Sequence, residues 1–446
     1  MSNIVIIGLG SGGFAAYLAI RKTDPEASII IIEKRAYDMF SPCGMPFAIE
    51  GVVKLEDLKF EVPGDKHLTK LLQHEALAIN SAEKKVQVKD LKTGDSVFVP
   101  YDSLIIAWGA KPFVPGIKGA KESIGDGVFV LHDIESAQKI IEFAKKAKRA
   151  VVVGAGPIGL EIAVALKEKG LEVEVVEMLS YAFPRALDRD MAGIIEKSLE
   201  GRGIKLLFDR TVRSINGSPV NSVSVDDEEI RIDMVVLASG VKADLEMAAS
   251  AGIETGRWGI RTNSRMETSI KGIFAVGDGI ETVSLIDHRP TVMQLSSAAY
   301  RQGMVAGTNA AGGYDMYEGA LGTFVSLIGE LEIAATGFSD SSARSAGFET
   351  ITGKAQGKNK PAYYPGAKDI TVKIIADAKT GKVLGGQAVG EGAGARINVI
   401  ALAIKNGIDI HALGRTETAY CPMLAENYDV LNKASDFAVR KLQKKR

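Results

Sequence analysis

The chain has 446 residues, which is too long for one compact core, so we expect roughly two to four domains. Its 54 basic residues are balanced by 55 acidic ones, which excludes a basic nucleic-acid-binding protein. No apolar run approaches the roughly 20 residues of a membrane-spanning helix, and the N-terminus has no secretory-signal pattern, so we expect a cytoplasmic protein. Two cysteines far apart in the chain exclude a disulfide framework, and we expect no metal site.

The first 33 residues predict a dinucleotide-binding unit of strand, helix and strand. Apolar strands are expected at residues 3–7 and 28–32, with a helix between them. The first strand is followed by the glycines of a G-x-G-x-x-G turn: Gly8, Gly10 and Gly13. This spacing allows a tight turn, lets the backbone approach a pyrophosphate, and lets the helix pack on the strand. Glu33 ends the second strand, where it can accept hydrogen bonds from ribose hydroxyls.

The same pattern returns in the middle of the chain. Strands are expected at residues 150–153 and 171–176, with a helix over 160–169. The second glycine turn contains Gly154, Gly156, Ile158 and Gly159. Glu177 ends the second strand and would bind a 2′-hydroxyl but repel a 2′-phosphate, so we expect NADH to be preferred over NADPH. Two such turns predict that one chain binds two dinucleotides, as a flavin enzyme reduced by a nicotinamide requires.

Residues 268–278 form a third landmark, an apolar strand that ends in Gly277-Asp278. Together with the two glycine turns, this segment resembles the pyridine nucleotide–disulfide oxidoreductase family, and the resemblance covers essentially the whole chain. In that family the first turn binds FAD, and the second turn, in an inserted domain, binds NAD(P)H. The resemblance implies that Asp278 accepts hydrogen bonds from the ribityl chain of FAD.

Two further segments, 104–110 and 235–240, resemble the crossings between the FAD and NAD domains of this family. Trp108 stands in the first crossing, where the family often has threonine. The resemblance implies an α/β protein with two Rossmann-like dinucleotide-binding domains and a C-terminal α/β dimerisation domain. The expected domains are 1–111 with 244–318 for FAD, 112–243 for NAD(P)H, and 319–446 for dimerisation.

The resemblance also implies which residues bind each cofactor. The expected FAD site comprises Gly8, Gly10, Ser11, Gly12, Gly13, Glu33, Lys34, Ser41, Pro42, Ala76, Ala107, Trp108, Gly109, Gly277 and Asp278. The expected NAD site comprises Gly154, Gly156, Ile158, Gly159, Glu177 and Gly240.

Cys43 determines the chemistry that the resemblance implies. The segment 40–47 reads Phe-Ser-Pro-Cys-Gly-Met-Pro-Phe and has one cysteine, so an intrachain dithiol is excluded. This arrangement resembles the single-cysteine branch of the family, which contains coenzyme A–disulfide reductases, NAD(P)H sulfur and persulfide reductases, NADH oxidases and NADH peroxidases. A thiolate at Cys43 can attack a disulfide or polysulfide, or can cycle through a sulfenic acid while oxygen or peroxide is reduced. A buried, unreactive cysteine is the alternative.

Features elsewhere in the chain separate the members of this branch. Peroxidases and many oxidases carry a histidine in the first glycine turn, where this chain has Ser11. The segments 361–366 and 419–422 resemble Tyr-Tyr-Pro-Gly and Ala-Tyr-Ala-Pro segments of the coenzyme A–disulfide and sulfur reductases. They imply three further catalytic candidates: Tyr363, Tyr364 and Tyr420. A tyrosine hydroxyl can donate a hydrogen bond to a departing thiolate, whereas packing in a dimer interface is the alternative role. Which of Tyr363 and Tyr364 faces the site stays open.

Cys421 stands where the dithiol reductases of the family have a catalytic histidine. One hypothesis is that Cys421 lies near Cys43 of the partner subunit and acts as a resolving thiol. Inert packing of Cys421 is the alternative.

The expected activity is FAD-dependent oxidation of NADH, with NADPH also an option, coupled to reduction of a coenzyme A disulfide, persulfide or polysulfide at Cys43. We expect a homodimer whose active site is shared across the interface, with Tyr420 of the partner subunit assisting. The side chains expected to bind the nucleotide phosphates of the substrate are Arg21, Lys22 and Arg301. The rival functions are an NADH oxidase, a reductase of a small electron-carrier protein, and a redox sensor. Whether coenzyme A is retained on Cys43 stays open.

Overall fold

The computed structural model describes residues 2–445 and divides the chain into two compact units. Unit 1 contains the chain up to Gly44, Lys54–Phe113 and Val241–Ala320, and unit 2 contains Met45–Val53, Val114–Gly240 and the chain from Leu321 onward. Each unit thus gathers segments that are far apart in the sequence. Within the described residues, no helix is both long and apolar enough to cross a bilayer.

A five-stranded parallel sheet forms the core of unit 1, in the order β21-β9-β1-β2-β5. Its strands are β1 (Asn3–Ile7), β2 (Ser28–Glu33), β5 (Leu68–Leu72), β9 (Ser103–Ile106) and β21 (Ile273–Ala275). The strands β1, β9 and β21 are apolar and almost wholly buried, which is typical of a parallel sheet covered on both faces. The predicted strands at 3–7 and 28–32 are confirmed, and the second is one residue longer.

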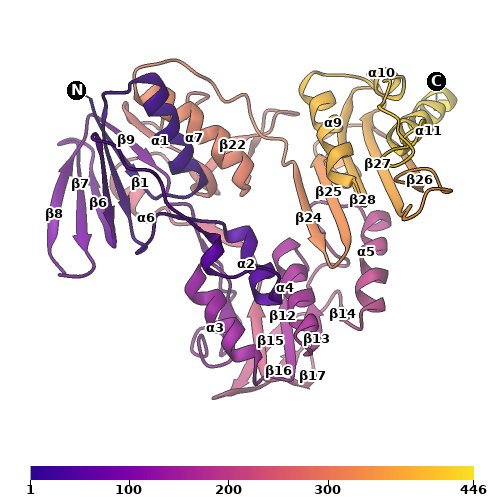
Figure 1. Cartoon of the computed structure of the whole chain (residues 1–446), viewed down its shortest axis with the longest axis horizontal. Coiled ribbons are helices and arrows are strands. Elements are labelled where there is room, and N and C mark those ends of the chain that lie inside the picture. The colour runs from indigo at the N-terminus through magenta and orange to yellow at the C-terminus, as the bar shows by residue number, and fades with distance from the viewer. Residues whose placement is uncertain (1, 446) are drawn as a thin grey trace. The chain divides into compact units, whose positions relative to one another are not determined.

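Two helices of unit 1, α1 (Ser11–Thr23) and α7 (Ser296–Ala310), lie side by side (Figure 1). Their close approach depends on small residues. A Cβ on Gly303 would collide with the carbonyl oxygen of Gly12, so a larger residue at that position would separate the two helices. The first glycine turn is therefore held between a strand and a second helix.

Shorter elements complete unit 1. The strands form sheets β3-β4, β6-β7-β8, β10-β19 and β20-β22-β23. Their bounds are β3 (Met39–Phe40), β4 (Lys59–Phe60), β6 (His74–Asn80), β7 (Lys85–Asp90), β8 (Ser96–Pro100), β10 (Ala110–Pro112), β19 (Val241–Ala243), β20 (Ile260–Arg261), β22 (Ile280–Val283) and β23 (Pro290–Thr291). The short helices are η1 (Pro42–Gly44), η2 (Glu56–Leu58), α6 (Glu246–Ser250) and η3 (Gly277–Gly279).

Unit 2 contains a second five-stranded parallel sheet, in the order β11-β18-β12-β13-β14. Its strands are β11 (Val128–Val130), β12 (Arg149–Val153), β13 (Glu172–Val176), β14 (Lys205–Leu207) and β18 (Met234–Leu237). The accompanying helices are α2 (Met45–Glu50), α3 (Ile134–Ala144), α4 (Pro157–Glu168) and α5 (Arg189–Gly201). A separate antiparallel sheet contains β15 (Val212–Gly217), β16 (Val220–Val225) and β17 (Glu228–Arg231). The predicted strand–helix–strand order around the second glycine turn is confirmed.

The helix predicted over 160–169 begins three residues earlier, at Pro157. Proline fits the first helical position because the N–H that it lacks would have no partner within the helix. The glycine turn thus leads directly into α4 and exposes the N-terminus of that helix to a ligand.

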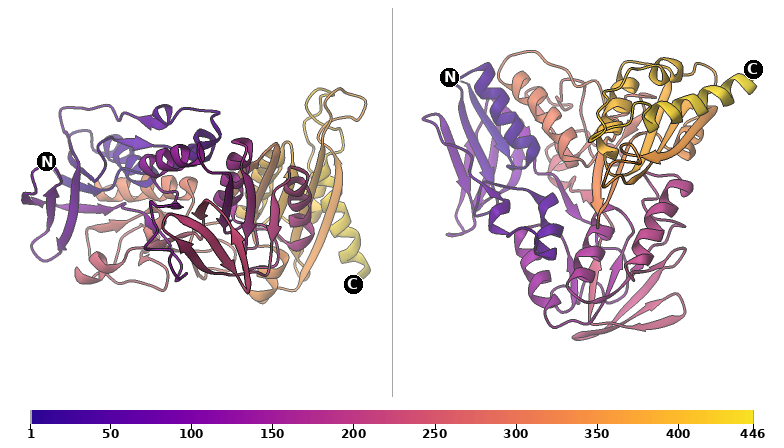
Figure 2. Two further views of the ribbon diagram at one scale, coloured as in Figure 1. Left: turned by 90° about the horizontal axis from the view of Figure 1, so that it is seen from below. Right: turned by 45° about the vertical axis from the view of Figure 1, so that its right-hand side comes forward.

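A five-stranded antiparallel sheet, β24-β25-β28-β27-β26, forms the rest of unit 2. The elements of this part are β24 (Phe324–Ile328), β25 (Leu331–Gly337), α8 (Asp340–Ser345), β26 (Thr350–Lys358), β27 (Asp369–Asp377), β28 (Val383–Gly390), α9 (Ala393–Lys405), α10 (Ile410–Gly414) and α11 (Val430–Lys445). Figure 2 shows α11, in yellow, lying along this sheet, where it packs on β26 and β27. A Cβ on Gly353 of β26 would collide with the carbonyl oxygen of Ala434 of α11, so helix and strand touch directly.

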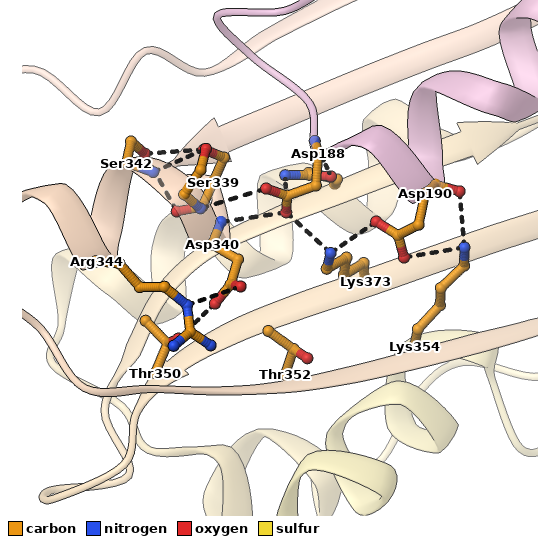
Figure 3. A network of polar contacts seen from close by, with 12 residues as sticks. Asp188, Asp190, Ser339, Asp340, Ser342, Arg344, Thr350, Thr352, Lys354 and Lys373 are labelled. Carbon is orange, nitrogen blue, oxygen red and sulfur yellow. Dashed lines mark hydrogen bonds and ion pairs between the residues drawn. The ribbon is translucent and has the colours of Figure 1, made fainter. Parts of the chain in front are cut away.

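A buried ionic cluster joins the two parts of unit 2 (Figure 3). Lys373 of β27 is 7% exposed, and its ammonium group lies 3.0 Å from Asp188 and 2.8 Å from Asp190, at the start of α5. Gln387 of β28 donates a further hydrogen bond of 2.9 Å to Asp188. Burial alone would lower the pKa of Lys373, but hydrogen bonds and charge attraction from the two aspartates outweigh it and raise that pKa above its usual value. Lys373 therefore stays charged and ties α5 to the antiparallel sheet.

Replacing Lys373 by methionine leaves Asp188 buried without its cation, so we expect the free energy of unfolding of unit 2 to fall by about 3–5 kcal/mol. Lys354→Met is the matched control, because Lys354 contacts Asp190 from a more exposed position. This substitution should lower the free energy of unfolding by less than about 1 kcal/mol. Urea unfolding measures both values, and equal losses in the two variants would contradict the role of Lys373.

Candidate functional site

The first glycine turn joins β1 to α1 and lies against the end of the neighbouring strand β9. Gly8 has a φ of +95°, and a Cβ there would lie 2.5 Å from the carbonyl oxygen of Ala107. A Cβ on Gly13 would collide with the carbonyl oxygen of Gly8, so only glycine lets α1 begin this close to the strand. Gly10 faces open space. The middle glycine therefore leaves its backbone accessible to a ligand.

The second glycine turn has the same geometry. Gly154 has a φ of +113°, and a Cβ there would lie 2.5 Å from the carbonyl oxygen of Ala238, which follows β18. A Cβ on Gly159 would collide with the carbonyl oxygen of Gly154, and Gly156 faces open space. Each unit thus has one turn in which two glycines permit close backbone contact and the middle glycine leaves room for a pyrophosphate.

Glu33 is buried at the end of β2, and this structure saturates its carboxylate with internal donors. One oxygen accepts hydrogen bonds from the backbone N–H of Leu9 and from the Arg35 guanidinium, at 2.8 and 2.7 Å. The other oxygen accepts from the backbone N–H and the Nε of Arg35, at 2.9 and 2.8 Å. Because an ionised carboxylate accepts about four hydrogen bonds, a ribose hydroxyl would have to compete with Arg35.

Glu177, the corresponding acid of unit 2, is bound differently. Its two oxygens accept from the backbone N–H groups of Ala155 and Leu179, each at 2.8 Å. Two of the roughly four acceptor positions of this carboxylate are thus used by the backbone. Phe183 donates its N–H to the carbonyl oxygen of Ala155, so the loop after Glu177 folds back onto the glycine turn. Glu177 has acceptor capacity left for ribose hydroxyls.

Two polar side chains of unit 1 fit a ligand that carries both hydroxyl groups and acceptor oxygens. Asp278 lies in η3, and burial raises the pKa of its carboxyl group to about 6. Trp108 follows β9, and none of the described residues accepts a hydrogen bond from its buried Nε1. The indole nitrogen lies close to η3, since a Cβ on Gly279 would be 3.6 Å from it. A buried donor and a buried carboxyl close to the first glycine turn match the ribityl and phosphate groups of FAD.

The helix N-termini of unit 1 converge at the predicted position of a pyrophosphate. Ser11 begins α1 and Ser296 begins α7, and their hydroxyl oxygens lie 2.7 Å apart. Neither helix has an acidic residue in its first turn. Two helix N-termini with unpaired N–H groups create a positive potential that suits an anion.

Cys43 lies in η1 and is exposed. The turn is fixed by a 2.9 Å hydrogen bond from the N–H of Ser41 to the carbonyl of Leu58, and by a 3.1 Å hydrogen bond from the N–H of Gly44 to the carbonyl of Ser41. Gly44 packs directly on the side chain of Leu58, which would have to shift to make room for a Cβ at this position. The thiol therefore stands on an anchored turn in unit 1, the unit that contains the first glycine turn, and its exposure does not fit the alternative of a buried cysteine.

The structure separates the two adjacent tyrosines. Tyr363 and Tyr420 form a hydrogen bond that raises the pKa of Tyr420, and both side chains are exposed. Tyr364 instead lies beside Lys360, whose ammonium group is 5.2 Å from the ring centre. Cys421 follows Tyr420 and is half-buried, and its carbonyl oxygen accepts backbone hydrogen bonds that close the turn after it. The two tyrosine segments predicted from the sequence thus meet on one surface of unit 2.

The predicted basic residues are not equivalent. The Arg21 guanidinium lies 2.6 Å from Asp65 and also donates to the carbonyl of Ala27, so its charge is largely satisfied within unit 1. Lys22 and Arg301 are exposed on α1 and α7.

The remaining predicted cofactor residues lie in or beside the two glycine turns and the crossings, except for Lys34 and Ala76. Gly12 packs on α7, Gly109 and Gly240 have positive φ values in the crossings, Gly277 donates its N–H to Gln302, and Ile158 is exposed at the start of α4. Lys34 pairs with Glu75 at 2.6 Å, and Ala76 is buried in β6. No cluster of metal-binding side chains is found within residues 2–445.

Sequence reasoning missed Glu161, an acidic residue in the first half of α4. Burial raises the pKa of its carboxyl group, and the carboxyl oxygen accepts a 2.7 Å hydrogen bond from Ser326 of β24. The available signal was a single acid within residues 157–166, a stretch that is otherwise apolar and directly follows a glycine turn. Glu161 links that helix to the antiparallel sheet of unit 2.

The two kinds of glycine should respond differently to alanine. Gly13→Ala brings a methyl group onto the Gly8 carbonyl oxygen, and we expect a loss of about 3 kcal/mol in stability. Gly10→Ala meets no protein atom and should cost under about 1 kcal/mol, yet its methyl group would block the approach of a pyrophosphate. Thermal melting and the FAD absorbance of the purified variants measure the two effects. Full retention of FAD in a stable Gly10→Ala variant would contradict this assignment.

Comparisons with known proteins agree with this geometry. Residues 2–303 match the family model "Pyridine nucleotide-disulphide oxidoreductase", and residues 325–431 match its dimerisation domain. The chain is 37% identical to a protein of Methanocaldococcus jannaschii named NADH oxidase, over 99% of both chains. It is 32% identical to the CoA-dependent NAD(P)H sulfur oxidoreductase of Pyrococcus abyssi, over 96% of both chains.

A solved structure, that of an NAD-dependent persulfide reductase from A. fulgidus, is similar over 99% of this chain and 84% of that one. The two have a TM-score of 0.94 and are 32% identical. The predicted fold class, with two dinucleotide-binding parts and a dimerisation domain, is confirmed. The chain belongs to the pyridine nucleotide–disulphide oxidoreductase family, whose members bind FAD and NAD(P)H.

Proposed function

We propose that this enzyme uses FAD and NAD(P)H to reduce a coenzyme A disulfide, persulfide or polysulfide through Cys43. The observation that carries the proposal is the exposed thiol on an anchored turn in the same unit as the first glycine turn. The segment 40–47 contains one cysteine and the second, Cys421, stands far along the chain, so the motif of Cys43 has no dithiol. Similarity to a CoA-dependent sulfur oxidoreductase and to a persulfide reductase over nearly the whole chain supports the substrate class.

The domain assignment is part of the proposal. Residues 1–111 and 244–318 would bind FAD, 112–243 would bind NAD(P)H, and 319–446 would form the dimerisation domain. The grouping of both proposed FAD segments into unit 1, apart from the α2 segment, supports this division. The free acceptor capacity of Glu177 supports a preference for NADH, because its carboxylate would repel a 2′-phosphate. We also propose a cytoplasmic location, where thiols are kept reduced.

The proposed sulfur chemistry needs one nucleophile and two electrons. The Cys43 thiolate attacks one sulfur of the disulfide, forms a new S–S bond to that sulfur, and releases the other half as a thiolate. FAD held at the first glycine turn would supply the two electrons, drawn from NAD(P)H as a hydride, that break the new S–S bond. The Cys43 thiolate is regenerated and the second thiol leaves after taking up a proton. One NAD(P)H and one proton thus convert one disulfide into two thiols.

The tyrosine pair would assist the departing thiolate. The hydrogen bond to Tyr363 raises the pKa of Tyr420, so this phenol stays protonated, and its single O–H would have to turn from Tyr363 to donate to the thiolate. We propose a homodimer in which Tyr420 of the partner subunit reaches the sulfur bound to Cys43. Exposed apolar side chains of the same region support burial of this surface in a dimer: Tyr420, Met423, Leu424 and Tyr428.

Basic side chains of unit 1 would bind the phosphates of coenzyme A. Lys22 and Arg301 are exposed and available for this role, whereas Arg21 would have to release Asp65. We therefore propose that Lys22 and Arg301 contribute more than Arg21.

An NADH oxidase is the second candidate, because the most similar of the relatives reported above carries that name. In that reaction Cys43 would cycle through a sulfenic acid while oxygen is reduced. Ser11 in place of a histidine in the first glycine turn favours the sulfur chemistry. The role of Cys421 as a resolving thiol stays a subordinate hypothesis of this proposal.

Cys43→Ser tests the proposal directly. Serine lacks a usable nucleophile at neutral pH, so we expect kcat/KM for coenzyme A disulfide to fall by at least about a thousandfold. Reduction of ferricyanide by NADH should stay within about twofold, because that reaction needs FAD but no thiol. Steady-state kinetics with both acceptors measures the two values.

Cys421→Ser is the matched control and should keep disulfide reduction within about threefold of the unmodified enzyme. Unchanged disulfide reduction by Cys43→Ser would contradict thiol chemistry. Faster turnover of oxygen than of every sulfur acceptor by the unmodified enzyme would favour the oxidase.

A further inference from the structure

A short segment joins the turn of the reactive cysteine in unit 1 to the interior of unit 2. Cys43 lies in η1, which ends at Gly44, and the residues that follow, Met45–Val53, belong to unit 2. The chain returns to unit 1 at Lys54. The turn that carries the thiol is therefore followed, with no intervening loop, by a segment that folds with the second dinucleotide-binding sheet.

This segment forms α2, which is buried in unit 2. Figure 1 shows α2 beside α3 and α4, and it packs on both helices. Met45, Ala48 and Ile49 are 3%, 6% and 0% exposed, and their spacing places them on one face of the helix. A helix of six residues has little stability of its own, so these contacts hold α2 in place.

Ile49 is the innermost anchor of α2. Its side chain belongs to the buried apolar cluster that also contains Ile140 of α3 and Leu160 of α4. The helix α4 begins at the second glycine turn. Ile49 therefore ties the segment that follows Cys43 to the core around the proposed NAD(P)H site.

The end of α2 is fixed as well. Gly51 has a φ of +94°, and its N–H donates to the carbonyl oxygen of Phe47 at 3.0 Å. A Cβ on Gly51 would lie 2.8 Å from the ammonium nitrogen of Lys169, the residue that follows α4. The chain leaves the core directly afterwards, since Val52 is 66% exposed. A shift of α2 along α4 would disturb the contacts of both Ile49 and Gly51.

The turn of Cys43 has a separate anchor on its N-terminal side. The N–H of Ser41 donates to the carbonyl of Leu58, and Gly44 packs on the side chain of Leu58. Along the chain, Cys43 is therefore bracketed by one anchor in unit 1 and another in unit 2. Fixing the backbone on both sides of a nucleophile restricts where its side chain points, and a misplacement of about 1 Å can slow a reaction about a hundredfold.

We propose that Ile49 is a positioning residue for Cys43. By anchoring α2 in the core of unit 2, Ile49 holds the backbone that follows the cysteine and so orients the Sγ atom for attack on the disulfide. The inference rests on the proposed function and names the residue through which unit 2 acts on the thiol.

Ile49→Ala tests this role in the two halves of the reaction. We expect oxidation of the NADH-reduced enzyme by saturating coenzyme A disulfide, followed by the return of flavin absorbance, to slow at least about tenfold. The disulfide concentration that gives half the maximal rate should change less than about twofold, because the anchor affects orientation and not substrate binding. Reduction of the enzyme by NADH should also stay within about twofold. Ile49→Val keeps most of the apolar contact and should restore the oxidation rate to within about threefold of the unmodified enzyme.

Ile195→Ala is the matched control, because Ile195 of α5 is also 0% exposed and belongs to the same apolar cluster. Both alanine substitutions should lower the melting temperature, but Ile195→Ala should leave the rate of oxidation by coenzyme A disulfide within about twofold. If Ile49→Ala does not fold, Gly51→Ala disturbs the other contact of α2 and should slow the same oxidation at least about threefold.

An oxidation rate within twofold of the unmodified enzyme in folded Ile49→Ala, or in Gly51→Ala where it serves as the substitute, would overturn the proposal. Equal slowing by Ile195→Ala would also overturn it, since a general loss of stability would then explain both variants. An unmodified enzyme whose reduced flavin is not oxidised by coenzyme A disulfide would instead contradict the proposed function itself.

Discussion

The carbonyl oxygen of Ala107 rests directly on Gly8, and the carbonyl oxygen of Ala238 rests on Gly154 in the same way. Each contact lies between two parallel neighbouring strands, β1 with β9 and β12 with β18. A side chain at either glycine would push the strand ends apart. Both dinucleotide turns, and the crossing segments beside them, therefore depend on backbone atoms that touch without any side chain between them.

The parts of the fold that depend on local spacing could be predicted from the sequence. Strands, glycine turns and helices alternate within about 30 residues in each half, and the apolar strands of a parallel sheet are recognisable because both faces are buried. The helix after the second turn began earlier than predicted, because Pro157 was not counted as a helical residue. The anchored, exposed turn of Cys43 agrees with the single-cysteine motif.

Contacts between distant segments could not be predicted. Nothing in the spacing shows that Arg35 saturates Glu33 while Glu177 keeps acceptor capacity, because both acids end equivalent strands. The pairing of Tyr420 with Tyr363 and not with Tyr364 depends on how two loops of unit 2 meet. The cluster around Lys373 likewise joins residues nearly 200 positions apart, and only the folded chain brings them together. Such side-chain partners decide the chemistry, although the backbone pattern decides the fold.

The proposed sulfur chemistry depends on Cys43 forming a mixed disulfide with one half of the disulfide substrate. Intact-protein mass spectrometry of enzyme purified without thiols, before and after mild reduction, tests it most directly. We expect a reducible adduct with the mass of coenzyme A, which peptide mapping places on Cys43 and not on Cys421. An unmodified Cys43, or one that carries only oxygen even after exposure to coenzyme A disulfide, would contradict the account and favour an oxidase.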